Sequence, residues 1–218
     1  MHLEILVEDA SGRRALEHLL PGIVGPGHTF SIHAYKGIGR IPPNMKDARD
    51  ASKRILLDNL PKLLKGFGRT FDGYGTDYDA AVVLVCDLDD NHLDRFLKEL
   101  NDVLNSCHPR PLTRFCLAIE EGEAWLLGDV PAVIGAYPHA DREVLNAYEN
   151  DSICGTWERL ADAVYPGGAA VLRKKGYQAI GAEKMRWAQE IAPRIDIANN
   201  QSPSFGFFRD EVRALIAG

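Results

Sequence analysis

The sequence predicts an α/β fold in which a mostly parallel sheet is flanked by helices. Two observations support this prediction. Apolar stretches with the length and residue types of strands alternate with amphipathic stretches of helical periodicity. The longest of the apolar stretches, from Ala80 to Cys86, is rich in Val and lacks polar alternation. Such a run is typical of a strand buried on both faces, as strands in parallel sheets are.

The elements can be placed in order along the first half of the chain. A first strand ends near Val7, and Ser11 is a plausible cap for a helix that Pro21 should end. The further expected elements are a second strand within residues 29–37, an amphipathic helix over 46–65, a turn-rich connector over 66–79 and the central strand.

The second half begins in the same way and then changes character. We expect a helix over 93–104, a strand over 114–119 and a short helix over 122–127. Beyond Asp129 the sequence suggests short helices, a glycine-marked loop over 165–178 and closing helices over 182–192 and 205–217. The predicted division is therefore an α/β core over 1–128 and a helical C-terminal elaboration, packed on that core, over 129–218.

Composition narrows the functional classes. The 218 residues are 45% hydrophobic and 26% charged, as in a soluble globular protein. A net charge of -6 argues against a wholly basic nucleic-acid-binding surface and leaves room only for a local basic patch. The chain has no apolar run of membrane-spanning length and no recognisable signal peptide, so we expect it in the cytoplasm.

Several common sites are not indicated. The four cysteines occur singly, without a CxxC pair, and the seven histidines never fall at HxxxH spacing, so neither a zinc site nor a disulfide scaffold is expected. The glycines near Gly37 lack the GxGxxG arrangement of a dinucleotide-binding fold.

Acidic residues follow three of the predicted strands. They are Glu8 and Asp9, then Asp87, Asp89 and Asp90, then Glu120, Glu121 and Glu123. Because the carboxyl ends of parallel strands lie at one edge of a sheet, acids distant in sequence can converge there on a divalent ion such as Mg²⁺. The simpler explanation, acids at helix N-termini, accounts for Asp9 and Glu121, and a capping role is also open for Asp90. Glu8, Asp87 and Asp89 form the predicted functional set.

These residues carry a resemblance. A strand ending in Glu8, followed by a helix and a later strand ending in Asp87-Leu-Asp89, is similar to the Toprim domain of topoisomerases, primases and OLD-family nucleases. More closely, VEDASGRRALEHLL, VVLVCDLDD, LAIEEGEAWLLGD and SPSFGFFRDEVRAL together resemble a bacterial family of Toprim-like proteins of unknown function, DUF4276. Members of that family are often encoded beside an AAA or SMC-like ATPase.

The resemblance implies a Toprim-like fold and Mg²⁺- or Mn²⁺-dependent phosphodiester hydrolysis on nucleic acid, most plausibly DNA, together with such an ATPase. Glu8 would be the acid/base or metal-binding glutamate, Asp87 and Asp89 the metal-binding pair, and Glu120 or Glu123 an auxiliary acid. The sequence departs from the wider Toprim pattern at Gly12, where a second acid often stands. That departure argues against a complete two-metal site.

Basic residues offer a route for nucleic acid. Arg173, Lys174 and Lys175 lie in the predicted loop and fit either contacts to a phosphate backbone or an ordinary solvated loop. Lys184 is a weaker candidate, for neutralising the charge of the transition state, and the alternative is that it only decorates a helix face.

Two other functions remain open. In a haloacid-dehalogenase-type phosphatase, Asp87 would be the nucleophile and Asp89 the acid/base, but that motif usually opens the chain. In a non-catalytic Toprim-like module, the chain would bind a ligand and dock on an ATPase, and Gly12 in place of an acid favours this reading.

Overall fold

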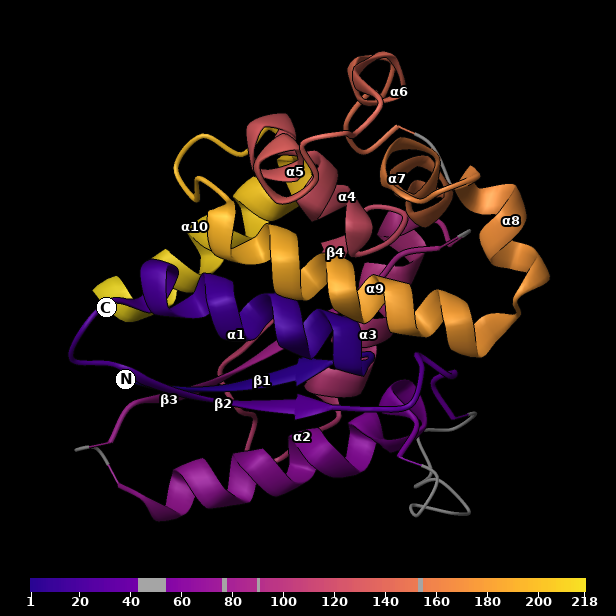
Figure 1. The fold of residues 1–218 in the computed structure, drawn as a ribbon. Coiled ribbons are helices and arrows are strands. Elements are labelled where there is room, and N and C mark those ends of the chain that lie inside the picture. Colours follow the sequence, from indigo (N-terminus) through magenta and orange to yellow (C-terminus); the bar gives the residue numbers. More distant parts are fainter. Residues whose placement is uncertain (43–53, 76–77, 90, 153–154) are drawn as a thin grey trace.

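The computed structural model describes residues 1–42, 54–75, 78–89, 91–152 and 155–218. Its centre is a sheet of four parallel strands, ordered β2-β1-β3-β4 (Figure 1). The strands are β1 (His2–Val7), β2 (Thr29–Ala34), β3 (Ala80–Asp87) and β4 (Thr113–Ala118). The predicted α/β class, with a parallel sheet flanked by helices, is confirmed.

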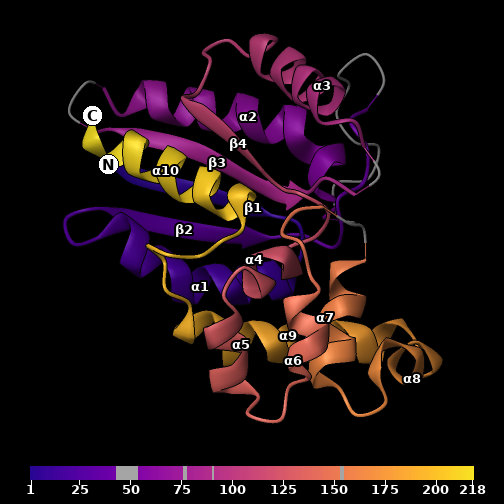
Figure 2. The same cartoon turned by 90° about the horizontal axis from the view of Figure 1, so that it is seen from above.

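Helices cover both faces of the sheet, as Figure 2 shows. One face packs against α1 (Ala10–Val24) and α10 (Pro203–Ala217), and α9 (Tyr177–Ile191) packs on α1. The other face packs against α2 (Leu56–Gly73) and α3 (Leu93–Asn105). Because helices shield both sides, water reaches the sheet mainly at its edges and strand ends.

The central strand β3 shows why its sequence lacks polar alternation. Val83 and Val85 pack into the core beneath α1, whereas Val82, Leu84 and Cys86 pack into the core beneath α2 and α3. Successive side chains of a strand point to opposite faces, so a strand covered on both sides must be apolar at every position. The prediction that this strand is buried on both faces is confirmed.

The C-terminal part of the chain consists of helices that share a core with the sheet. Besides α9 and α10 it contains α5 (Val130–Ala136), α6 (Arg142–Asn146), α7 (Thr156–Val164), α8 (Gly168–Lys174) and a 3-10 turn, η3 (Ala192–Arg194), and it follows the short α4 (Glu123–Leu127). Phe205 and Phe208 of α10 are fully buried, with ring centroids 5.6 and 4.9 Å from that of Trp125 on α4. The boundary at residue 128 stays a prediction.

Helix α1 is longer than the sequence suggested, and its cap is a different residue. Asp9 is the N-cap: its Oδ1 accepts a 2.7 Å hydrogen bond from the Gly12 N–H, and Ser11 Oγ donates to its Oδ2. The expected stop at Pro21 was wrong, because the helix continues through Pro21 to Val24. Leu19, Leu20 and Ile23 are buried, and this packing outweighs the loss of one backbone donor at the proline.

Helix α2 begins later and ends later than predicted. The described part of the expected helix starts only at Leu56, and the supposed connector is helical as far as Gly73. Residues 46–53 of the expected helix lie outside the described residues. One of the glycines that suggested turns serves packing, because a Cβ on Gly68 would overlap the carbonyl oxygen of Pro109.

The expected glycine-marked loop over 165–178 was also wrong in part, because residues 168–174 form α8. Gly167 and Gly168 start this helix with φ angles of 81° and 66°. These left-handed angles suit glycine, so the pair marks the entry to a helix rather than a long loop.

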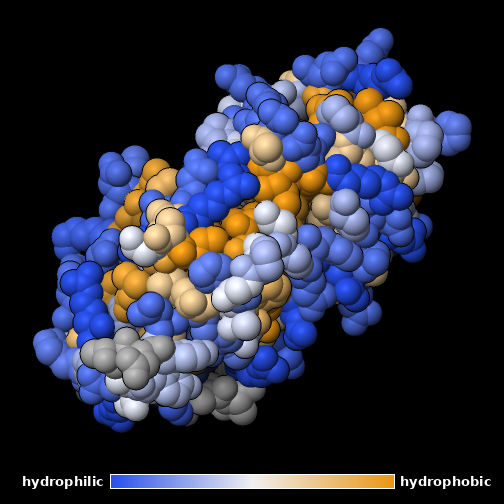
Figure 3. All heavy atoms as spheres, turned by 90° about the vertical axis from the view of Figure 1, so that its left-hand side faces the viewer, coloured by the Kyte–Doolittle hydropathy of each residue, from blue (hydrophilic) through white to orange (hydrophobic). Residues whose placement is uncertain are grey.

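The parallel strands all begin at the same end of the molecule, opposite their carboxyl ends. Figure 3 views the molecule from that side and shows a band of apolar side chains crossing the face between polar regions. In the part of the chain that the structure describes, no helix is both long and apolar enough to cross a membrane.

Candidate functional site

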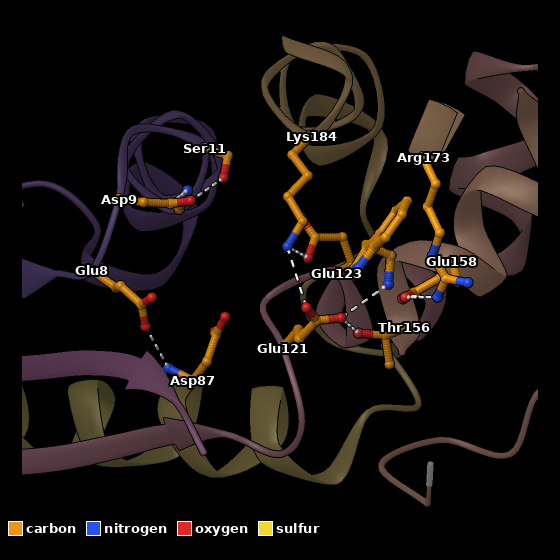
Figure 4. Close-up of polar contacts among 12 residues, drawn as sticks. Glu8, Asp9, Ser11, Asp87, Glu121, Glu123, Thr156, Glu158, Arg173 and Lys184 are labelled. Atoms are coloured by element: carbon orange, nitrogen blue, oxygen red, sulfur yellow. Dashed lines mark hydrogen bonds and ion pairs between the residues drawn. The ribbon is translucent and has the colours of Figure 1, made fainter. Parts of the chain in front are cut away.

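Two acids from neighbouring strands meet at the carboxyl edge of the sheet. Val7 pairs with Val85 in the parallel β1–β3 ladder, so Glu8, one residue further on, and Asp87, two residues further on, both lie just beyond the end of that ladder. The Asp87 N–H lies 3.4 Å from Glu8 Oε2 and donates to it, and both side chains point toward the same space in Figure 4. The predicted convergence of Glu8 and Asp87 is therefore seen in the geometry.

That space is a small cavity of about 50 Å³. Its apolar side includes Val7, Val85, Trp125 and Leu126. Its polar side is lined by Glu8, Asp9, Ser11, Asp87, Glu123 and Lys184. A water needs roughly 10–15 Å³ of such space, so the cavity has room for a few waters or a partly hydrated ion. It is too small for a nucleotide.

Burial and mutual repulsion make ionisation of the two acids unfavourable. Burial is the main reason that the pKa of Glu8 is raised to about 7. The charges of Asp89 and Asp9 also raise this pKa, whereas the hydrogen bond from the Asp87 N–H and the charge of Lys184 lower it. Burial also raises the pKa of Asp87 well above its usual value, with added repulsion from Glu8 and Glu123. Two carboxylates that share a site without enough positive charge behave in this way.

Lys184 is the one cation among the described residues that line the cavity, and it is paired with acids other than Glu8 and Asp87. Its Nζ lies 2.9 Å from Glu123 Oε2 and 3.4 Å from Glu121 Oε1. Burial lowers the pKa of Lys184, but the charges of Glu123 and Glu121 outweigh this and hold it above its usual value. Lys184 does not decorate an exposed helix face: its side chain is only 17% exposed.

Glu121 joins three elements behind the cavity. Its Oε2 accepts hydrogen bonds from Thr156 Oγ1 at 3.0 Å and from the Trp157 N–H at 3.1 Å, while its Oε1 faces Lys184 (Figure 4). It thus satisfies the N-terminus of α7, although the sequence suggested a helix cap without indicating which helix. Asp9, the other expected cap, stabilises the N-terminus of α1.

Asp89 lies at the rim of the site. The residue is exposed, has a left-handed φ of 47°, and is absent from the described cavity lining. Its charge still raises the pKa of Glu8, which places it near the cavity mouth. Asp90 lies outside the described residues, and the N-cap position of α3 is His92.

The two predicted auxiliary acids have separate environments. Glu123, 5% exposed, lines the cavity and pairs with Lys184. Glu120, also 5% exposed, is not among the lining residues, and its Oε2 has no hydrogen-bond partner within the described structure. Burial raises the pKa of Glu120 to about 7, with further repulsion from Glu121 and Asp151.

The residues of the cavity fit a single hydrated divalent ion. In the described part of the chain, no group of three or more His, Cys, Asp or Glu side chains is arranged to hold a metal ion. Mg²⁺, however, is commonly held by one or two carboxylates, with waters and substrate phosphate completing its shell. Glu8 and Asp87 supply two carboxylates beside a cavity with room for water, and Lys184 is already paired with Glu123.

Gly12 has a steric reason to lack a side chain. A Cβ there would lie 2.7 Å from Val7 Cγ2 and 3.3 Å from Asp9 Oδ1. An acid at position 12 therefore cannot fit without displacing β1 or the helix cap. The missing second acid is a feature of how α1 packs on β1, and it limits the site to the acids already named.

The predicted basic cluster is helical and is not part of the cavity lining. Arg173 pairs with Glu158, and its guanidinium lies 5.5 Å from the centre of the Trp157 ring. Lys175 Nζ lies 2.6 Å from Tyr165 Oη, whereas Lys174 is exposed at the end of α8. Arg173 and Lys175 thus hold local structure, and their contact with nucleic acid stays a prediction.

Comparison with known proteins gives a family for the chain. A family model described as a domain of unknown function (DUF4276) matches residues 7–213. The chain belongs to the DUF4276 family. The matched range includes Glu8, Asp87, Glu123 and Lys184, so the whole candidate site lies inside the family domain. No match was found among curated proteins or among solved structures.

Proposed function

We propose that this DUF4276 protein is a Mg²⁺- or Mn²⁺-dependent nuclease that hydrolyses phosphodiesters at the Glu8–Asp87 edge. The supporting observation is that these two carboxylates meet beside a small cavity. The one cation among the described lining residues, Lys184, is paired with Glu121 and Glu123 instead. Carboxylates in such surroundings are stabilised by a hard divalent cation. The likeness of the sequence to Toprim domains supports the same chemistry, and nucleic acid as the substrate.

Each residue then has a role that follows from its position. Asp87, on the more buried strand, would hold the ion, and Glu8 would share it or take the proton from the attacking water. A bound Mg²⁺ or Mn²⁺ would supply a water of lowered pKa and neutralise charge on the phosphoryl oxygens. Lys184 adds positive charge behind the site, while Asp89 at the rim and Glu123 in the wall would orient water.

The test is cleavage of plasmid and single-stranded DNA in Mg²⁺ or Mn²⁺, with and without an ATPase encoded beside the gene. We expect Asp87→Asn and Glu8→Gln each to lower the cleavage rate by about 100-fold or more, because they remove a metal ligand or the base. Asp102→Asn is the matched control, since it makes the same change at an exposed carboxylate on α3 and should leave the rate unchanged.

A binding module is the second candidate, and the packing of Gly12 favours it. With no room for a second acid, the site would bind one ion and a phosphate without enough charge for rapid hydrolysis. Metal-dependent nucleic-acid binding without cleavage under any of these conditions would support the module over the nuclease. Release of phosphate from small phosphomonoesters, without cleavage of DNA, would instead indicate the aspartate-nucleophile phosphatase.

A further inference from the structure

A polar groove of about 500 Å³ lies at the same carboxyl edge of the sheet as the acidic cavity, on the side covered by α2 and α3. It is formed by the segment that follows β2, around Arg40, and by the start of α3, around His92 and Arg95. Both segments lead away from the carboxyl edge of the sheet, and the Gly37 N–H donates a 3.1 Å hydrogen bond to the carbonyl oxygen of Glu8. The segment that forms one wall of the groove is therefore hydrogen-bonded to the backbone of Glu8.

The wall around Arg40 is held in place by hydrogen bonds to α2. The Leu56 and Leu57 N–H groups donate to the carbonyl oxygens of Gly37 and Ile38, at 3.1 and 2.8 Å. The Arg40 N–H donates to Asp58 Oδ1 at 2.9 Å, so this carboxylate is engaged by the backbone. The Arg40 side chain is exposed and, among the described residues, contacts no carboxylate.

The opposite wall also presents positive charge. Arg95 is paired with Glu99 at 3.0 Å, but its side chain is 82% exposed, and such a pair exchanges readily for another anion. His92, the N-cap residue of α3, lines the groove, and among the described residues it gives this 13-residue helix no side-chain cap, while Asp94 lies in the first turn. The helix dipole adds positive potential to that of the arginines.

The cavity and the groove, on the two sides of the carboxyl edge, differ in what they can hold. The acidic cavity has about 50 Å³ and takes an ion with a few waters, whereas the groove has about 500 Å³ and carries cations on both walls. A chain with net charge -6 needs a local positive surface to bring a polyanion to its acids. From this juxtaposition we propose that the Arg40–Arg95 groove binds the phosphodiester backbone of the nucleic acid whose scissile phosphate reaches Glu8 and Asp87.

This inference rests on the proposed function for its substrate, but it is tested by binding alone. The full-length protein is titrated in EDTA, where no cleavage occurs, against labelled single-stranded DNA, duplex DNA and single-stranded RNA of equal length, at several salt concentrations. The variant is Arg40→Ala/Arg95→Ala. The control is Arg110→Ala/Arg142→Ala, which removes the same charge at two exposed arginines away from the groove.

For the tightest-binding nucleic acid, we expect the groove variant to bind at least ten-fold more weakly than the control at moderate salt. The slope of log K against log salt should fall in magnitude by about 1.4 for a single strand or about 1.8 for a duplex, because two phosphate contacts are lost. Equal affinity of the groove and control variants, or no binding by the wild type to any of the three, would overturn the proposal.

The outcome separates this proposal from the nuclease. If the protein binds nucleic acid through the groove but never cleaves it, the groove proposal stands and the nuclease proposal is refuted. Cleavage with an unchanged salt slope in Arg40→Ala/Arg95→Ala would keep the nuclease and refute the groove.

Discussion

Two pairs of acids lie near Lys184, and they differ in whether their charges are matched by a cation or by hydrogen-bond donors. Glu121 and Glu123 both contact the Lys184 ammonium, and Glu121 also accepts two hydrogen bonds from α7. Glu8 and Asp87 face the same cavity but share one weak hydrogen bond and repel each other. The first pair holds helices together, while the second pair stays costly to ionise.

The difference separates structural acids from candidate functional ones. A buried carboxylate is ordinarily matched by a cation or by N–H donors, because an unmatched one costs several kcal/mol. Glu121 and Glu123 follow that rule. Glu8 and Asp87 depart from it at the edge of a parallel sheet, where ligands bind, and a departure at such a place favours function over packing. Four substitutions or conditions test this contrast.

The largest effect on stability is expected at Lys184. Lys184→Met keeps much of the apolar stem but leaves Glu121 and Glu123 without their cation, so the free energy of unfolding should fall by about 3–5 kcal/mol. Lys98→Met is the control, because Lys98 makes an exposed pair with Asp102 on α3. Urea denaturation of both variants measures the difference. Similar stability of the two would mean that Glu121 and Glu123 are not held by Lys184.

The pH dependence of stability should reveal the second pair. Glu8 has a pKa of about 7 in the folded protein, against 4.5 for a glutamate carboxyl in the unfolded chain. Between these two pH values the folded state therefore binds more protons than the unfolded state. Stability of the metal-free protein should therefore fall as the pH rises from about 4.5 to about 7, by roughly 3 kcal/mol from Glu8.

Glu8→Gln removes this contribution, so the loss of stability between these two pH values should be smaller in the variant than in the wild type. Chemical denaturation at pH 5 and pH 8 gives the comparison. Parallel pH profiles for wild type and Glu8→Gln would contradict the raised pKa. Added Mg²⁺ should stabilise the wild type more at pH 8 than at pH 5, because the ion binds the ionised acids.

A smaller loss is expected at Gly12, where packing excludes a second acid. Gly12→Ala places a Cβ 2.7 Å from Val7 Cγ2 and should cost about 1–3 kcal/mol. In the background Val7→Ala the same substitution should cost much less, because the clashing methyl is gone. Thermal melting of the four proteins of this double-mutant cycle measures the coupling. An absence of coupling would leave the steric explanation for Gly12 unsupported.

The smallest effect is expected at Arg173, which the sequence linked to nucleic acid. Arg173 pairs with Glu158 and stacks on Trp157, with its side chain 61% exposed, so Arg173→Ala should lower the unfolding free energy by no more than about 1 kcal/mol. The salt slope of DNA binding should stay unchanged. If the salt slope falls as far as in Arg40→Ala/Arg95→Ala, Arg173 does contact nucleic acid.

The sequence was sufficient where a signal is local to a strand or its end. The apolar run before Asp87 predicted β3 and its burial. The position of Glu8 after β1 predicted a neighbour of Asp87, because the carboxyl ends of parallel strands lie at one edge of the sheet. Asp9 was recognisable as an acid at a helix N-terminus, although Ser11 was expected to be the cap. These predictions use contacts between residues close in sequence or fixed by the sheet.

Signals that depend on distant partners could not be read in the same way. Pro21 and Gly68 are breakers by local propensity, but burial of α1 and the approach of Pro109 to α2 override that propensity. Nothing near Lys184 in the sequence indicates that it lies between Glu121 and Glu123, over 60 residues away. The Arg40–Arg95 groove was missed for the same reason, since its walls come from separate loops.

The most direct test is a calorimetric titration of Mn²⁺ into the metal-free protein at pH 8. We predict one ion bound per chain, at least ten-fold weaker binding in Asp87→Asn and in Glu8→Gln, and unchanged binding in Asp102→Asn. Binding that is absent in the wild type, or equally strong in Asp87→Asn, would contradict the claim that these two acids are kept unpaired for a divalent cation.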